Sequence, residues 1–145
     1  MLKYLTAPIR KQSIIEWQNY IYGKHGFFMV TNGHILIMYP HPDAPDTPGQ
    51  YFDRKLKPAN IVSPFPNCFE LKERFDFNLG RRVAGFESSG GVSVAHGISF
   101  REKYVGMVLG RLESFQMFLT KGKHPALCVY FNDGVSAYVM PMVGD

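Results

Sequence analysis

The chain has 145 residues, a formal net charge of +4, and 46% hydrophobic against 19% charged residues. This balance excludes a disordered chain and a coiled coil, and the length is typical of one domain with a real core. No apolar run approaches the ~20 residues that cross a bilayer, and no signal peptide is apparent. We therefore expect a single cytoplasmic domain over residues 1–145, without membrane contact and β-rich because aromatic residues make up 14%.

The first half of the chain indicates short strands and turns. Residues 1–5 are a strand candidate, and residues 10–22 fit either a helical face or one side of a strand. We favour the strand, because residues 23–26 are typical of a hairpin turn. The segment FFMVT, then Asn32 and Gly33, then HILIMY predicts a hairpin with a two-residue type I′ turn. Seven of the ten prolines lie in residues 40–66, which predicts a loop with at most short edge strands.

Polar and apolar residues alternate in the middle of the chain. The segments RFDFNL, RRVAGFE and VSVAHGI, the last two separated by SSGG, predict an antiparallel meander with one buried face. In the last third, FQMFLT, ALCVYFN and VSAYVMPM predict three more strands. The Asp133-Gly134 dipeptide is a strong hairpin signal between the last two.

One helix is predicted over residues 100–113. Ser99 and Glu102 have the spacing of a capping box, in which each side chain satisfies a free backbone N–H at the start of a helix. An apolar stripe at helical spacing should face the core, and it consists of Val105, Val108, Leu109 and Leu112. Gly106 and Gly110 interrupt the opposite face. Either something approaches this face closely, or the helix tolerates two weak formers.

The patterns of common enzyme sites are absent from the sequence. No pair of histidines or cysteines has a recognised zinc spacing, and Cys68 and Cys128 lie in apolar surroundings typical of buried thiols. No phosphate-binding glycine loop or G-x-S-x-G elbow is present. We expect no catalytic residue, metal or cofactor, while an unrecognised enzyme stays an alternative because catalytic residues come together in space rather than in sequence.

Two stretches resemble the bacterial replicative sliding clamp. VTNGHILIMY resembles the clamp motif ATDGHRLA, and the end of the chain, AYVMPMVGD, resembles the clamp's C-terminal YVVMPMRL. The predicted helix and strands between them follow in the same order as in a clamp domain. The resemblance implies a single α+β clamp-like domain, with antiparallel sheets and one or two helices.

The resemblance also implies a site for a partner peptide. In clamps, both motifs help to build a hydrophobic groove that accepts a short linear peptide of a polymerase. The matching residues here are Thr31, Gly33, His34 and Leu36 in the first motif and Val139, Met140, Pro141 and Met142 in the second. Methionine is flexible and polarizable and suits a groove that accepts several peptides. The alternative is that these residues belong to the core or only complete a turn.

Three functions remain open at this stage. The first is a non-enzymatic, oligomeric clamp-like processivity or DNA-associated factor, of the kind expected from a phage or mobile element. Non-specific contacts to the phosphates of duplex DNA would come from Lys103, Arg111, Arg81 and Arg82. A monomeric or dimeric clamp-fold regulator or decoy that binds protein and not DNA is the second function, and an enzyme is the third.

Overall fold

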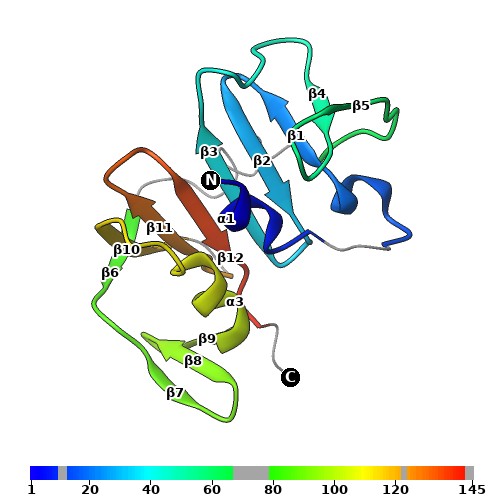
Figure 1. Ribbon diagram of the computed structural model, residues 1–145. Coiled ribbons are helices and arrows are strands. Elements are labelled where there is room, and N and C mark those ends of the chain that lie inside the picture. Colours follow the sequence, from blue (N-terminus) through cyan, green and yellow to red (C-terminus); the bar gives the residue numbers. More distant parts are fainter. Residues whose placement is uncertain (10–12, 67–78, 122–123, 143–145) are drawn as a thin grey trace. The chain divides into compact units, whose positions relative to one another are not determined.

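The computed structural model describes residues 1–9, 13–66, 79–121 and 124–142. The chain divides into two compact units, Met1–Pro66 (unit 1) and Asn67–Asp145 (unit 2). Both consist mainly of antiparallel strands accompanied by short helices, as Figure 1 shows. The predicted α+β class with antiparallel sheets is confirmed.

Unit 1 contains five strands and two short helical segments among its described residues. They are, in order, α1 (Leu2–Thr6), the 3₁₀ helix η1 (Glu16–Asn19), β1 (Ile21–Lys24), β2 (Phe27–Thr31), β3 (Ile35–Pro40), β4 (Gln50–Phe52) and β5 (Pro58–Ala59). The strands are antiparallel in the order β5-β4-β1-β2-β3. Leu5, Ile21, Val30 and Ile37 are completely buried and form the centre of this unit's core. After β3 ends at Pro40, the segment to residue 66 contains two short strands; β5 lies at the edge of the sheet, whereas β4 lies between β5 and β1 and is not the edge strand expected.

The N-terminus of unit 1 differs from the expected strand. Residues 2–6 form a helix, in which the Leu5 amide donates to the Met1 carbonyl at 3.0 Å. The adjacent residues Tyr4 and Leu5 are both buried, whereas a strand would direct them to opposite faces. The periodicity of this short apolar run does not distinguish a helix from a strand. Its helical conformation is favoured because it lets the rest of the unit bury both side chains.

The strand favoured over residues 10–22 begins only at Ile21. Residues 16–19 form a 3₁₀ turn, and residues 10–12 lie outside the described part of the chain. The turn after β1 is confirmed: His25 and Gly26 both have positive φ angles, 53° and 78°, which are typical of a type I′ hairpin.

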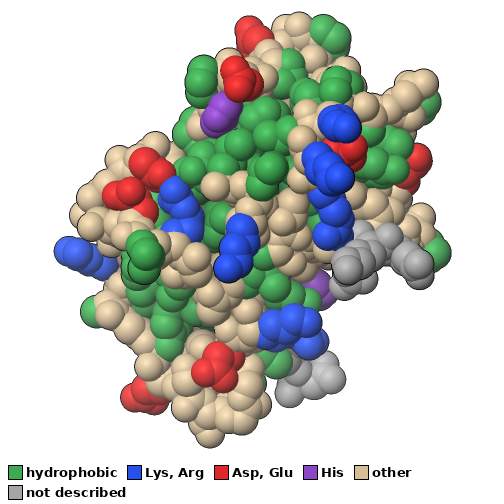
Figure 2. Space-filling model, in the orientation of Figure 1, with side chains coloured by type: hydrophobic (Ala, Val, Ile, Leu, Met, Phe, Trp, Pro, Cys, Tyr) green, Lys and Arg blue, Asp and Glu red, His purple; other side chains and the backbone are tan. Residues whose placement is uncertain are grey.

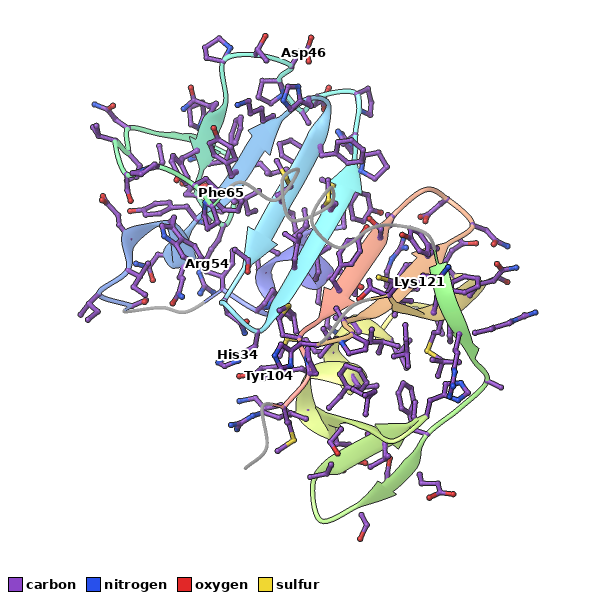
Figure 3. The ribbon with its side chains drawn as sticks, turned by 180° about the vertical axis from the view of Figure 1, so that it is seen from behind. His34, Asp46, Arg54, Phe65, Tyr104 and Lys121 are labelled. Carbon is purple, nitrogen blue, oxygen red and sulfur yellow. The ribbon has the colours of Figure 1, made fainter. Side chains whose placement is uncertain are left out.

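Aromatic side chains stabilise one end of unit 1. The Phe65 ring stacks on Tyr22 with 4.6 Å between centroids, and Trp17 meets Phe65 edge-on at 5.9 Å. Tyr51 completes the cluster at 4.8 Å from Tyr22, and its hydroxyl donates to the Ser63 carbonyl at 2.6 Å. These contacts fix the segment after β5 onto the sheet (Figure 3).

Unit 2 contains seven strands and one helix among its described residues. They are β6 (Leu79–Val83), β7 (Glu87–Ser89), β8 (Val92–Ala95), β9 (Ile98–Arg101), α3 (Glu102–Val108), β10 (Phe115–Thr120), β11 (Leu127–Phe131) and β12 (Ser136–Val139). Four of these strands are arranged as β12-β11-β10-β6, and β7-β8-β9 form a separate three-stranded sheet. Helix α3 follows β9 directly and contacts β8, β9 and β12, which places Val105 and Val108 in the core.

The predicted meander in unit 2 is only partly right. The turn at Gly90 and Gly91 joins β7 to β8 as expected, but β6 pairs with β10. These two strands are more than 30 residues apart in the sequence, and the alternation of polar and apolar residues within a strand does not indicate which distant strand it pairs with. Residues 74–78, the start of the predicted meander, lie outside the described residues.

The helix prediction was too long. Helix α3 has seven residues rather than fourteen, and Leu112 lies beyond its end with its side chain fully exposed. The capping box is also wrong, because Ser99 belongs to β9 and no side chain caps the helix start at Arg101. Nothing lies within 4 Å of the position that a Cβ on Gly106 would take, so no described residue approaches this face of the helix closely at Gly106.

Candidate partner-binding elements

The turn loop, residues 31–36 of unit 1, is held by side-chain hydrogen bonds. The last pair in the register is Thr31 with Leu36, so four residues separate the paired positions instead of the two of a type I′ turn. The Asn32 side-chain oxygen accepts from the His34 amide at 2.9 Å and from the Ile35 amide at 3.1 Å. Only Gly33 in this loop has a positive φ, 88°. The hairpin is therefore confirmed, but its turn type was predicted wrongly.

A second layer of hydrogen bonds supports the same loop. The Thr31 hydroxyl accepts from the Gly33 amide at 3.1 Å, and the buried Gln18 amide donates to the Asn32 carbonyl at 3.4 Å. Gly33 and His34 are exposed, while Thr31 and Leu36 are half-buried. Gly33 and His34 are therefore exposed on a backbone that the side chains of Gln18, Thr31 and Asn32 hold in place. No signal in the sequence indicated the role of Gln18 in supporting this loop. The role of Asn32 could have been predicted, because asparagine in a turn often bonds backbone amides two or three residues further on.

The methionine segment, residues 140–142 of unit 2, lies at the surface. Strand β12 ends at Val139, whose side chain is completely buried. Met140 and Met142 each keep 38% of their surface exposed. The Met142 amide donates to the Ser99 carbonyl at 2.8 Å, which fixes the segment to β9. Of the four residues predicted here, Val139 lies in the core, and the two methionines are on the surface beside half-buried Pro141.

The four predicted DNA-binding residues have different surroundings in unit 2. Arg81 and Arg82 lie exposed on β6, and Lys103 lies exposed on α3 with its Nζ 5.8 Å from the centre of the Tyr104 ring. Arg111 instead donates to both carboxylate oxygens of Asp133 and lies 4.6 Å from the centre of the Phe131 ring. The hydrogen bond from Arg111 lowers the pKa of the Asp133 carboxyl. The charge of Arg111 is therefore already neutralised.

The basic side chains do not form one continuous face on the visible side of the molecule. Figure 2 shows the Lys and Arg side chains in several separate groups, with hydrophobic and acidic side chains between them.

The described residues contain no obvious metal centre. No group of three or more His, Cys, Asp or Glu side chains among them could hold a metal ion. Cys128 is completely buried, as expected, and burial raises the pKa of its thiol to about 12, so it is a poor nucleophile. Cys68 lies outside the described part. None of the helices described here is long and apolar enough to cross a membrane.

Comparison with solved structures gives the fold a known relative. The chain is similar to the crystal structure of the DNA polymerase III subunit beta from Pseudomonas aeruginosa, with a TM-score of 0.57. The chain has a clamp-like fold. Sequence identity is 16%, and the similarity covers 97% of this chain and 64% of that protein, so it spans less than two thirds of its relative. No family model and no curated protein matches the sequence.

Proposed function

We propose that this chain is a non-enzymatic, cytoplasmic clamp-like module, a single domain in function, that captures a short linear peptide of a replication-type partner. The observation that carries the proposal is the methionine segment. Met140 and Met142 expose apolar surface at the end of a strand that is otherwise buried, and exposed apolar patches mark binding sites more often than chance.

The geometry of this segment suits a peptide anchor. The hydrogen bond from the Met142 amide to Ser99 holds the backbone, while the two thioether side chains keep three rotatable bonds each. A fixed backbone lowers the entropy lost on binding, and flexible side chains adapt to different apolar anchors. Covering one such anchor completely contributes roughly 1.5–3 kcal/mol.

The turn loop is the second element of the proposed peptide-binding function. Gly33 leaves the backbone accessible, and His34 beside it offers a polar group that can orient a peptide. Thr31 and Leu36 flank them, and the Asn32 side chain keeps the loop in one conformation. Val139, from the core, supports the methionine segment from within unit 2 without touching a ligand.

A direct test uses fluorescence anisotropy with labelled peptides that carry leucine and phenylalanine on a neutral polar background. Met142→Asp should weaken binding by about tenfold or more, because a charge replaces buried apolar contact. Met142→Leu should retain binding. Leu112→Asp is the matched control, because Leu112 is fully exposed elsewhere in the same unit.

The stability of the variants distinguishes a role of Met142 in ligand binding from a role in the core. If Met142 contacts a ligand, the melting temperature of Met142→Asp stays close to the wild-type value, since surface substitutions usually change stability by less than ~0.5 kcal/mol. Unfolding of Met142→Asp, or equal weakening by Leu112→Asp, would remove Met142 from the proposed site.

Duplex DNA binding by an oligomer is the second candidate function. It is favoured by Arg81, Arg82 and Lys103, which are exposed and have no carboxylate partner among the described residues. The relative identified above is a subunit of a DNA polymerase, which is consistent with a DNA-associated role. A mass measurement in solution, with and without duplex DNA, tests it. A monomer or dimer whose mass does not change when duplex DNA is added would instead support a regulator or decoy that binds protein and not DNA.

A further inference from the structure

An open depression of about 630 Å³ lies in unit 2, and none of the residues of the methionine segment lines it. Its rim carries Arg81, Lys121 and His96, and its apolar lining comes from Ile98, Leu119 and Pro125. Arg81 belongs to β6, Ile98 to β9 and Leu119 to β10. His96 lies in the β8–β9 turn, and Lys121 and Pro125 lie between β10 and β11. Cationic groups therefore stand beside an apolar floor.

A β-bulge in β6 shapes the depression. Leu79 pairs with Thr120 and Arg82 with Phe118, so Gly80 and Arg81 together lie opposite Leu119 alone. A Cβ on Gly80 would stand 2.7 Å from the Leu119 carbonyl oxygen, so only glycine allows the strands to approach this closely. Bulges re-aim side chains, and both bulge residues, Gly80 and Arg81, line the depression.

Lys121 lies close to the same bulge. Its Cγ is 3.5 Å from the position of that hypothetical Gly80 Cβ, so its aliphatic chain lies beside Gly80 of β6; Figure 3 labels Lys121. Both cations are exposed, and neither forms an ion pair with a carboxylate in the part of the chain that the structure describes. Two like charges that line the same depression favour an anion within it.

The third rim residue, His96, is fixed in position. It occupies the left-handed region at φ 50° in the turn before β9, with Gly97 following at φ 78°. Its Nε2 lies 2.8 Å from the Arg82 carbonyl oxygen, so this nitrogen carries the hydrogen and donates. The ring thereby ties the turn to β6 and keeps that side of the depression open and rigid.

We propose that this depression binds a short acidic peptide that carries an apolar side chain beside its carboxylates. Charge complementarity selects the acidic residues, which Arg81 and Lys121 contact. The apolar lining selects the neighbouring side chain, because a bare inorganic anion would leave the half-buried Ile98 and Pro125 in contact with water. A nucleic-acid strand requires cations along its length, whereas the described lining of this depression contains one arginine and one lysine, Arg81 and Lys121.

The test measures fluorescence anisotropy of labelled probes with the full chain at low salt. The first probe is a peptide of alternating aspartate and leucine. Asparagine replaces aspartate in the second, and serine replaces leucine in the third. Labelled oligothymidylate is the fourth. The aspartate–leucine peptide should bind about tenfold more tightly than each of the others, because only it uses both the charges and the floor.

Variants locate the binding in the depression. Arg81→Ala and Lys121→Ala should each weaken the aspartate–leucine peptide about two- to fivefold, as expected for exposed charge pairs. Lys55→Ala, an exposed lysine of unit 1, is the control and should change nothing. Equal binding of the neutral peptide, tighter binding of oligothymidylate, or wild-type binding by the folded Arg81→Ala/Lys121→Ala double variant would each overturn the proposal.

Discussion

The Arg111 guanidinium donates to both carboxylate oxygens of Asp133, with 3.1 Å between Nη1 and Oδ1. This pair joins the segment after α3 to the turn between β11 and β12, across 22 residues of sequence. Arg111 also packs over the Phe131 ring, which is almost completely buried. A residue expected to contact DNA phosphates therefore has an evident role within unit 2.

Replacing Asp133 should destabilise the protein modestly. Asp133→Asn leaves the guanidinium without its charged partner and should cost about 1 kcal/mol, a discounted value because the carboxylate is partly exposed. Arg111 lowers the pKa of Asp133, so its contribution is present above the ordinary pKa and disappears as pH falls through the lower folded pKa. Urea unfolding at pH 7 and at acid pH measures this loss. Glu113→Gln, a control on an exposed carboxylate of the same unit, should leave stability unchanged.

Two glycines in unit 2 should respond in opposite directions to alanine. Gly80→Ala places a Cβ 2.7 Å from the Leu119 carbonyl oxygen, so the strands must separate at a cost of roughly 1–3 kcal/mol. Gly106→Ala in α3 meets no atom within 4 Å and should stabilise the protein by roughly 0.5–1 kcal/mol through helix propensity. Thermal unfolding of both variants provides the comparison, and a stabilising Gly80→Ala would contradict the bulge geometry.

Alkaline pH should weaken the fold. Burial raises the pKa of Cys128 to about 12, and burial also raises the pKa of Tyr130 and Tyr138. The unfolded chain loses the Cys128 proton near the ordinary pKa of 9.0 while the folded chain keeps it, so stability falls as pH rises above this value. At pH 10 the loss from Cys128 is roughly 1–2 kcal/mol. Urea unfolding from pH 8 to 10 measures it, and Cys128→Ala should flatten the profile.

If an oligomer binds duplex DNA, salt should weaken binding in a defined way. The three exposed cations Arg81, Arg82 and Lys103 give a slope of roughly −2.7 per protomer in a plot of log affinity against log salt, which is roughly a 40-fold loss between 50 and 200 mM. Lys103→Ala should reduce this slope by about 0.9. Arg111→Ala should leave it unchanged because Asp133 already neutralises that charge. Salt-independent binding or a strong sequence preference would exclude phosphate neutralisation as the mode.

Local patterns in the sequence were sufficient to predict the hairpins and the α+β class. The dipeptides Asn32-Gly33 and Asp133-Gly134 lie between alternating apolar runs, and the chain reverses at both. Turn chemistry and side-chain alternation act over a few residues, so they can be recognised without knowing the rest of the fold.

Long-range contacts decided what the sequence left ambiguous or indicated wrongly. Gln18, 14 residues before Asn32, helps to fix the turn loop, and burial of Tyr4 and Leu5 makes residues 2–6 a helix. The pairing of β6 with β10, like that of Arg111 with Asp133, joins residues distant in sequence. Local periodicity gives each segment its preference, but the partner that buries a face or neutralises a charge is chosen only when the whole chain has folded.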